Sequence, residues 1–426
     1  MTGPDLTAVE CRVLEAIDEA ALVADLVHLV RVPSVTGSDA EADLQHQHGA
    51  RLAELGFDVD LWDFDLEALT AHPDFPGTEA PRTQGYGLAA TLGPWGTPAL
   101  VLQGHVDVVP TGDVDKWGGG DPWSGAITGT TLRGRGACDM KAGAAVNLAV
   151  AHALVASGVN LARPLAVHSV VSEEDGGLGA FATMLRGHRG DVAVIPEPTS
   201  GRVVTANAGA LTFELKVAGQ AAHGSAPYTG YSALTAFLPV YAALDDLQRR
   251  RNTEPDPRYA DNPMPYPISV GTVRSGDWAS SVPDLLVAQG RLGVRLGEEP
   301  HEARTEFEHA IAEVCARDPW LADHPVEVSW PGGQFASGQL DSGHGFVRDV
   351  LTVIRDVEGR DAALGAAPYG SDLRLYAGMG GIATLHYGPG DVAYAHAPRE
   401  QVEIPEVIAV ARTLAVLAAR QCGAHL

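Results

Sequence analysis

Apolar residues at helical and strand spacings divide the first two hundred residues into alternating helices and strands. The segment 13–32 has Leu and Ile at three- and four-residue steps, so it predicts an amphipathic helix that Pro33 ends. A second helix is predicted over 39–55, with Gly56 after it. Strands are predicted at 99–102, 165–171 and 191–195, with a helix over 139–157. This alternation predicts an α/β domain with a mostly parallel sheet and covering helices.

A second type of pattern begins near residue 203. A period-two strand over 211–217 and a helix over 232–250 come first. They are followed by strands at 268–273 and 285–294, a helix at 302–316 and a strand at 326–329. This order predicts a small α+β two-layer sandwich. After it, an apolar strand at 381–385 and a helix at 405–420 return to the first pattern. We therefore expect a first domain formed by 1–202 and 331–426, interrupted by a second domain at 203–330.

Composition and charge exclude several classes of protein. With 426 residues, 45% of them hydrophobic, the chain can bury a sizeable core. Its 29 basic and 54 acidic residues give a net charge of −25, so we expect no nucleic-acid partner. No apolar run approaches the roughly 18 residues of a membrane span, and we expect no membrane partner. The four cysteines are scattered and no signal peptide is recognisable, which favours a cytoplasmic protein.

Five potential metal ligands occur in short turn-like motifs, several of them directly after predicted strands. They are His105, Asp139, Glu174, Glu197 and His396. Two imidazoles and three carboxylates suit a pair of divalent ions, with zinc as the best fit. If an aspartate bridges the ions, each ion has two ligands of its own and an open position for water. Any one of these residues alone has an ordinary structural explanation, but the ordered set indicates a single site at the C-terminal strand ends.

In these motifs the chain resembles the M20 family of di-zinc amidohydrolases and peptidases over nearly its whole length. The motifs are Gly-His-Val-Asp at 104–107, Asp-Met-Lys at 139–141 and Glu-Glu at 173–174. The resemblance implies two zinc ions per chain, for which Co or Mn are possible substitutes. One ion would be held by His105, Asp139 and Glu197, and the other by Asp139, Glu174 and His396.

Two acidic residues next to the ligands are predicted to take part in catalysis. By the resemblance, Asp107 orients the ring of His105, and the two-residue spacing on a strand puts both side chains on one face. Glu173 precedes the ligand Glu174 and is not itself needed as a ligand. Such a glutamate beside two zinc ions can take the proton of a bridging water and return it to the leaving amine, so Glu173 is the predicted general base.

The inserted domain resembles the lid and dimerisation domain of the family, which implies a homodimer. His223 matches the histidine that crosses the dimer interface to contact the substrate carbonyl. An arginine that relatives often have in this domain is replaced by Gly293, which Arg291 and Arg295 flank. Either of them, or Arg374, is a candidate for holding a substrate carboxylate, and we favour Arg374.

The resemblance implies a metal-dependent amidohydrolase for a small N-acylated substrate. A zinc-activated water would cleave the acetyl, succinyl or formyl amide of an amino acid or related amine. The group of acetylornithine deacetylase and succinyl-diaminopimelate desuccinylase fits the chain length and the 369–374 segment best. A metallo-dipeptidase or carboxypeptidase with the same centre is the alternative. A catalytically silent relative that binds a metabolite or serves as a scaffold is a third reading, against which the intact Glu173 and five ligands argue.

Overall fold

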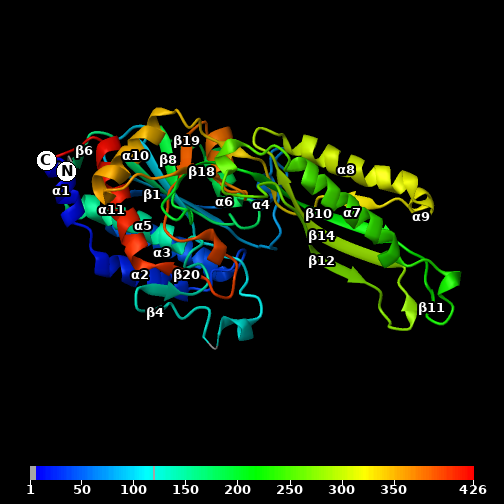
Figure 1. Cartoon of the computed structure of the whole chain (residues 1–426). Coiled ribbons are helices and arrows are strands. Elements are labelled where there is room, and N and C mark those ends of the chain that lie inside the picture. Colours follow the sequence, from blue (N-terminus) through cyan, green and yellow to red (C-terminus); the bar gives the residue numbers. More distant parts are fainter. Residues whose placement is uncertain (1–5, 119) are drawn as a thin grey trace.

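The computed structural model describes residues 6–118 and 120–426 and consists of two domains side by side (Figure 1). The larger domain contains a nine-stranded sheet in the order β1-β2-β7-β3-β8-β19-β9-β17, with β18 paired to β9. Both chain ends lie on this domain, at the side remote from the smaller domain (Figure 1). The smaller domain is inserted between the two parts of the larger one and extends away from it.

The centre of the large sheet is parallel. It consists of β7 (Leu165–Val170), β3 (Leu100–His105), β8 (Val192–Ile195) and β19 (Ala383–His386). The flanking strands β1 (Asp58–Asp63) and β2 (Tyr86–Leu92) run antiparallel on one side. On the other side are β9 (Val203–Asn207), β17 (Gly338–Gln339) and β18 (Leu364–Ala367). The predicted α/β fold is therefore confirmed, with parallel strands at the centre of a sheet whose outer pairs are mainly antiparallel.

Helices cover both faces of this sheet. Along β3, Leu100 and Leu102 pack in one hydrophobic core and Val101 packs in another, so neighbouring side chains enter opposite layers. The first core includes α1 (Ala8–Glu15), α2 (Glu19–Arg31), α3 (Asp39–Glu54), α5 (Lys141–Ala156), α10 (Gly345–Glu358) and α11 (Ile404–Gln421). The second includes α6 (Leu178–Arg186) and Leu69 of α4 (Leu66–Thr70). Burial on both faces explains why the central strands are apolar throughout.

The first part of the chain differs from the prediction in two places. The single helix predicted over 13–32 is wrong, because the segment forms the end of α1 and then α2. Asp18 starts the second helix, since its carboxylate accepts a hydrogen bond from Ala21 N at 2.9 Å. The strand β2 was not predicted, although it lies inside the sheet between β1 and β7.

The smaller domain is a layer of antiparallel strands under two long helices, the second of which is followed by a short third helix. Its elements are β10 (Gly209–Ala218), α7 (Ala233–Arg251), β12 (Ile268–Ser275), β14 (Leu285–Val294), α8 (Pro300–Arg317), α9 (Pro319–Asp323), β15 (Glu327–Ser329) and β16 (Gln334–Phe335). The predicted strand-helix-strand-strand-helix-strand order is present. Residues 203–207, expected in this domain, instead pair in the large sheet as β9.

Several short strands lie outside the two main sheets. The strands β4 (Ala126–Thr128), β5 (Thr131–Arg133) and β20 (Gln401–Glu403) form a three-stranded sheet on the larger domain. Beside the C-terminus, β6 (Asn160–Leu161) pairs with β21 (Ala424–His425) (Figure 1). A ribbon of β11 (Ala222–His223) and β13 (Ser281–Val282) forms the far tip of the smaller domain (Figure 1). Among the described residues, none of the helices combines the length and the apolar character that crossing a membrane requires.

Helix α5 packs very closely against the end of β8. A Cβ atom at Gly143, in the first turn of α5, would lie 2.3 Å from the carbonyl oxygen of Pro196. No real Cβ is found so close to a backbone atom, so only glycine allows this approach. Because Asp139 precedes α5 and Glu197 follows Pro196, the contact also fixes how these two carboxylates face each other.

We predict that Gly143→Ala destabilises the protein although alanine favours helices. The added methyl group must push α5 away from Pro196, and overpacking of this kind costs about 1–3 kcal/mol of unfolding free energy. Urea unfolding should show this loss. Gly345→Ala is the matched control, because Gly345 is also helical and its Cβ would meet only the end of the Arg348 side chain at 3.7 Å. That control should be neutral or stabilising by up to about 1 kcal/mol, and equal behaviour of both variants would contradict the prediction.

Candidate metal centre and adjoining cavity

Four of the five predicted ligands follow the C-terminal ends of the parallel strands. His105 is the last residue of β3, Glu174 follows β7, Glu197 follows β8 and His396 follows β19. Asp139 joins them from the loop before α5. Since these strand ends meet at one edge of the sheet, segments far apart in sequence contribute to a single site.

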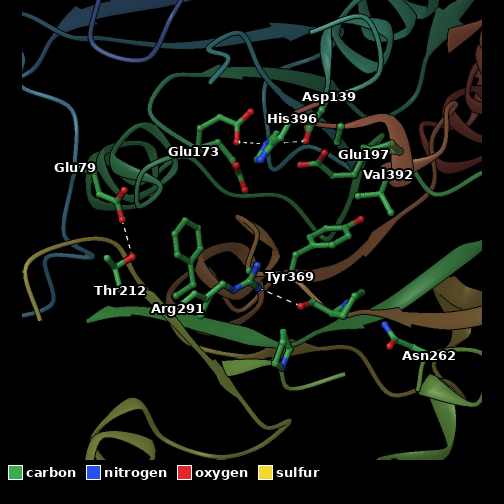
Figure 2. Close-up of a pocket in the computed structure, with 18 of the residues that line it drawn as sticks. Glu79, Asp139, Glu173, Glu197, Thr212, Asn262, Arg291, Tyr369, Val392 and His396 are labelled. Carbon is green, nitrogen blue, oxygen red and sulfur yellow. Dashed lines mark hydrogen bonds and ion pairs between the residues drawn. The ribbon is translucent and has the colours of Figure 1, made fainter. Parts of the chain in front are cut away.

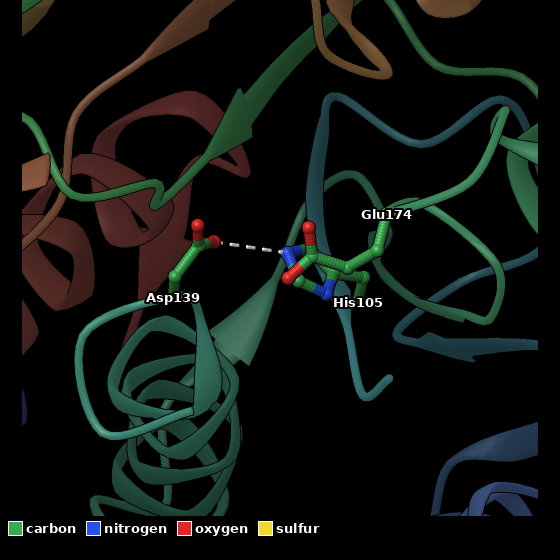
Figure 3. Close-up of side chains that lie close together, drawn as sticks. All are labelled: His105, Asp139 and Glu174. Atoms are coloured by element: carbon green, nitrogen blue, oxygen red, sulfur yellow. Dashed lines mark hydrogen bonds and ion pairs between the residues drawn. The ribbon is translucent and has the colours of Figure 1, made fainter. Parts of the chain in front are cut away.

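Asp139 lies between two groups of side chains. Its Oδ1 is 3.3 Å from Nε2 of His105, and its Oδ2 is 3.5 Å from Nε2 of His396. Glu197 Oε1 lies 3.9 Å from His105 Nε2, and Glu174 Oε2 lies 2.9 Å from His396 Nε2. Figure 3 shows His105, Asp139 and Glu174, whose possible ligand atoms all lie within 4.8 Å of one another. The structure thus brings all five predicted ligands together, in two groups that share Asp139.

The crowded carboxylates fit a bound divalent ion. Burial raises the pKa of Glu174, and its Oε1 is buried without a hydrogen-bond partner in the part of the chain that is described. Burial and the charge of Asp139 raise the pKa of Glu197 well above its usual value. A cation would supply the missing partner and offset the repulsion. Imidazole and carboxylate donors are the ligands that zinc and similar ions take.

The two imidazoles respond to the negative charge around them. Burial alone would lower the pKa of His105, but its contacts with Asp107 and Asp139 raise it well above the usual value. The charge of Glu174 raises the pKa of His396 to about 11. Both rings are therefore held by carboxylates, and the site as a whole attracts positive charge.

Asp107 is completely buried and supports the site mainly through backbone groups. Its Oδ1 and Oδ2 accept hydrogen bonds from the backbone N–H groups of Glu173 and Glu174, each at 3.2 Å. The ring Nδ1 of His105 is nearer to the carbonyl oxygen of Asp107, at 2.9 Å, than to its carboxylate, at 3.5 Å. Asp107 thus contacts His105, its predicted partner. Its carboxylate also fixes the segment that carries Glu173.

Glu173 lines the cavity beside the ligands. It is 7% exposed, and burial raises its pKa well above the usual value. The preceding Ser172 has φ +62° and His396 has φ +59°, both in the left-handed region that non-glycine residues rarely adopt. Such strained backbone is typical of functional sites.

Glu400 also supports the centre and was missed in the sequence. Its Oε1 accepts hydrogen bonds from the backbone N–H groups of Cys138 and Asp139, both at 3.1 Å. Its Oε2 lies 2.5 Å from Nη1 of the buried Arg135. This pair fixes the loop that carries Asp139. Only the short distance to His396 along the chain could have indicated it.

A cavity of about 470 Å³ opens from the candidate metal centre between the two domains (Figure 2). The larger domain contributes Asp139, Glu173, Glu174, Glu197 and His396, and the smaller domain contributes Ala210, Thr212, Asn262, Met264 and Arg291. At the rim, Glu79 of the larger domain accepts a hydrogen bond from Thr212 Oγ1 at 2.7 Å. A bound molecule would therefore contact both domains.

Of the three candidate arginines, only Arg291 lines this cavity. Arg374, which we favoured, is buried, and its guanidinium donates to the carbonyl oxygens of Ser371 at 2.9 Å and Gly176 at 2.6 Å. The preference for Arg374 is not supported by this placement, because its guanidinium N–H groups already donate to backbone carbonyl oxygens. Arg295 lies beyond the end of β14 and pairs with Glu306 at 3.4 Å.

His223 is not brought to the centre of its own chain. It lies in β11 at the far tip of the smaller domain (Figure 1), is exposed, and contacts Ser225 Oγ through Nδ1 at 2.7 Å. It is not among the residues that line the cavity. A role at a metal centre would therefore have to be in another copy of the chain.

We predict that Asp107→Asn weakens metal binding. The amide keeps the size of the side chain but places an NH₂ group against a backbone N–H donor, so the Glu173–Glu174 segment loses a hydrogen bond. Loss of such a supporting partner typically lowers metal affinity about 10- to 100-fold. Competition with a chelator of known zinc affinity would measure it. Asp113→Asn, at an exposed helix start, is the control, and equal zinc affinity of both variants would contradict the prediction.

Comparisons with known proteins agree with this geometry. Residues 101–420 match Peptidase family M20/M25/M40. N-formyl-4-amino-5-aminomethyl-2-methylpyrimidine deformylase of Halalkalibacterium halodurans is 26% identical, with 88% of this chain and 87% of the relative covered. Acetylornithine deacetylase of Proteus mirabilis is 27% identical, with coverages of 88% and 90%. The fold is similar to that of the dipeptidase Dug1p of Saccharomyces cerevisiae, with a TM-score of 0.77, 13% identity and coverages of 97% and 98%. The chain belongs to Peptidase family M20/M25/M40.

Proposed function

We propose that the protein is a di-zinc amidohydrolase that removes a formyl, acetyl or succinyl group from the nitrogen of an amino acid or a related small amine. The observation that carries the proposal is the pair of ligand groups that share Asp139, with Glu173 in the wall of the same cavity. Relatives named as a deformylase and a deacetylase, each aligned over most of the chain, support it.

His105, Asp139 and Glu197 would hold one ion, and Asp139, Glu174 and His396 the other. When bound, two such ions polarise the acyl carbonyl and make a water molecule acidic enough to lose a proton near neutral pH. The residues of the chain then have two tasks. They keep the acyl carbon close to that water, and they move the proton.

Glu173 is the proposed general base. Its carboxylate takes a proton from the water as the water oxygen forms a bond to the acyl carbon. The same carboxyl group then gives this proton to the amine nitrogen as the carbon–nitrogen bond breaks. The products are the free carboxylic acid and the amine, and Glu173 returns to its starting form. Burial suits this role, because a carboxylate with a raised pKa holds the proton between the two steps.

Arg291 is the group we propose for holding a substrate carboxylate. It lies in the wall across from Glu173 and the ligands, and its Nη2 donates to the carbonyl oxygen of Pro368 at 3.1 Å (Figure 2). Its Nη1 forms no hydrogen bond within the described residues, so a second donor is available. A cavity of this volume is suited to a small metabolite.

We predict that Glu173→Gln keeps its zinc content but lowers kcat at least about 100-fold, because glutamine cannot accept the proton. Glu174→Gln should instead lose zinc, since it changes a ligand. Zinc content and turnover of N-formyl, N-acetyl and N-succinyl amino acids and of dipeptides would be measured together. Loss of zinc in Glu173→Gln would mean that the two roles are exchanged. Preference for dipeptides would indicate a peptidase, and no turnover at all would indicate a silent relative.

We also propose that the working unit is a homodimer formed through the smaller domain. Helix α7 exposes Leu234, Leu238 and Tyr241, which are 49%, 60% and 53% exposed and recur at helical spacing on one face. Strand β12 pairs with β14 alone among the described strands, which leaves one edge open. These two features are adjacent in the fold and would be covered by a second copy. His223 could then reach the cavity of the partner.

Mixing His223→Ala chains with Glu173→Gln chains tests this arrangement. If a site needs Glu173 of its own chain and His223 of the other, a mixed dimer has one complete site and one site that lacks both residues. Its activity should exceed that of either parent variant and approach half the wild-type value per mixed dimer. The measurement is turnover after subunit exchange, with the separate variants as controls. No recovery of activity would place His223 and Glu173 in the same chain and contradict the proposal.

A further inference from the structure

A second cavity of about 410 Å³ adjoins the first. The residues that line both cavities, and so form the boundary between them, are Pro198, Asn262, Pro368, Tyr369 and Val392. Figure 2 shows Tyr369, Asn262 and Val392 along one side of the first cavity. Two of the boundary residues come from segments that carry ligands, since Pro198 follows Glu197 and Val392 precedes His396 by four residues. The boundary therefore lies next to the candidate metal centre.

The positive charges of the second cavity are already paired. Arg202 Nη2 lies 3.2 Å from Asp261 Oδ2, and Arg258 contacts both carboxylate oxygens of Asp256 at 2.9 Å. Asp391 also lines the cavity, and it forms no ion pair with any residue that the structure describes. The unbalanced charge of this cavity is therefore negative. An anionic group would find no free cation there and would meet Asp391.

Hydrogen-bonding groups remain available in the same wall. Asn262 Oδ1 accepts from Met264 N at 2.9 Å, while its NH₂ group has no partner within the described residues. The side chain of Arg202 is 38% exposed, and within the described residues it donates through Nη2 alone, to Asp261 and to the carbonyl oxygen of Leu364. The phenol of Tyr369 forms no hydrogen bond within 6–118 and 120–426. Asp391 Oδ1 accepts from Ala393 N at 2.9 Å, which leaves Oδ2 as an acceptor. Donors from Asn262 and Arg202 and this acceptor are therefore available in the wall, and they favour a guest with hydrogen-bonding groups.

We infer that the second cavity is an extension of the substrate site and that it takes an uncharged, hydrogen-bonding part of the substrate, such as an amide. Tyr369 and Asn262 lie at the passage between the two cavities. This inference rests on the proposed hydrolysis of an N-acyl bond at the metal centre. It specifies the substrate further: the molecule is longer than an acetylated small amino acid, and its distal part is neither alkyl nor anionic.

Two sets of probes of equal length test the inference with the zinc-loaded protein. The first set extends the amine side and consists of N-acetyl-L-glutamine, N-acetyl-L-norleucine and N-acetyl-L-glutamate. The second extends the acyl side and consists of N-(acetylglycyl)-, N-pentanoyl- and N-succinyl-L-alanine. In one of the two sets the amide member should have a kcat/KM at least about tenfold above both the alkyl and the anionic member, as expected for a site with hydrogen-bonding groups.

Variants locate the effect in the second cavity. In Asn262→Ala and Arg202→Met the ratio of kcat/KM between the amide and alkyl members should fall toward one, because partners of the amide are removed. In Asp391→Asn the anionic member should gain relative to the alkyl member. Arg163→Met is the matched control, since Arg163 forms an exposed pair with Asp191 at 2.5 Å and lines neither cavity. Each ratio is taken within one variant, so a general loss of activity cancels.

The outcomes separate this inference from the function on which it rests. Hydrolysis of the probes with ratios near one in the wild-type protein overturns the inference and leaves the proposed function standing. The inference is also overturned if Asn262→Ala and Arg202→Met keep the wild-type preference for the amide member as fully as Arg163→Met does. The amide would then bind elsewhere. If no probe is hydrolysed, the proposed function fails and the inference fails with it.

Discussion

The contact of Asp139 with both His105 and His396 is the interaction on which the rest of the site depends. Placing four carboxylates at one edge of a sheet is electrostatically costly, since each buried negative charge loses its hydration. The protein offsets this cost with fixed partners around the centre. Asp107 accepts two backbone N–H groups, and Glu400 accepts two more while it pairs with Arg135. The ligand geometry is therefore set by buried groups that do not face the cavity.

The same constraint explains the close packing beneath the site. Asp139 is positioned by the start of α5, and Glu197 by the end of β8, and these two elements meet where Gly143 contacts Pro196. A shift of α5 by the size of one methyl group would change the separation of the two carboxylates. Metal ligands need distances correct to a few tenths of an ångström, so core packing and metal geometry are coupled at this point.

The amino-acid sequence predicts the parts of the site that local motifs determine. Each of the five ligands stands in its own turn next to a strand or helix, so residue type and position were sufficient to find it. Glu400 was missed because its role depends on contacts with a loop more than 250 positions earlier in the chain. The preference for Arg374 over Arg291 rested on a local motif, and only the folded chain shows that the Arg374 guanidinium donates to the carbonyl oxygens of Ser371 and Gly176. The break between α1 and α2 was missed because the apolar spacing continues across Asp18, whose capping bond interrupts the helix.

Reaction and substrate choice are placed in different parts of the fold. The groups that would bind metal and move a proton all belong to the larger domain, in motifs that the family resemblance identifies. The opposite wall comes from the smaller domain, where Arg291, Thr212 and Asn262 stand on separate segments with no common motif. Glu79 joins the two sides through Thr212. The second wall can therefore change without altering the metal centre. In the function that we propose, Arg291 on one side of the cavity and the residues around Tyr369 on the other select the substrate.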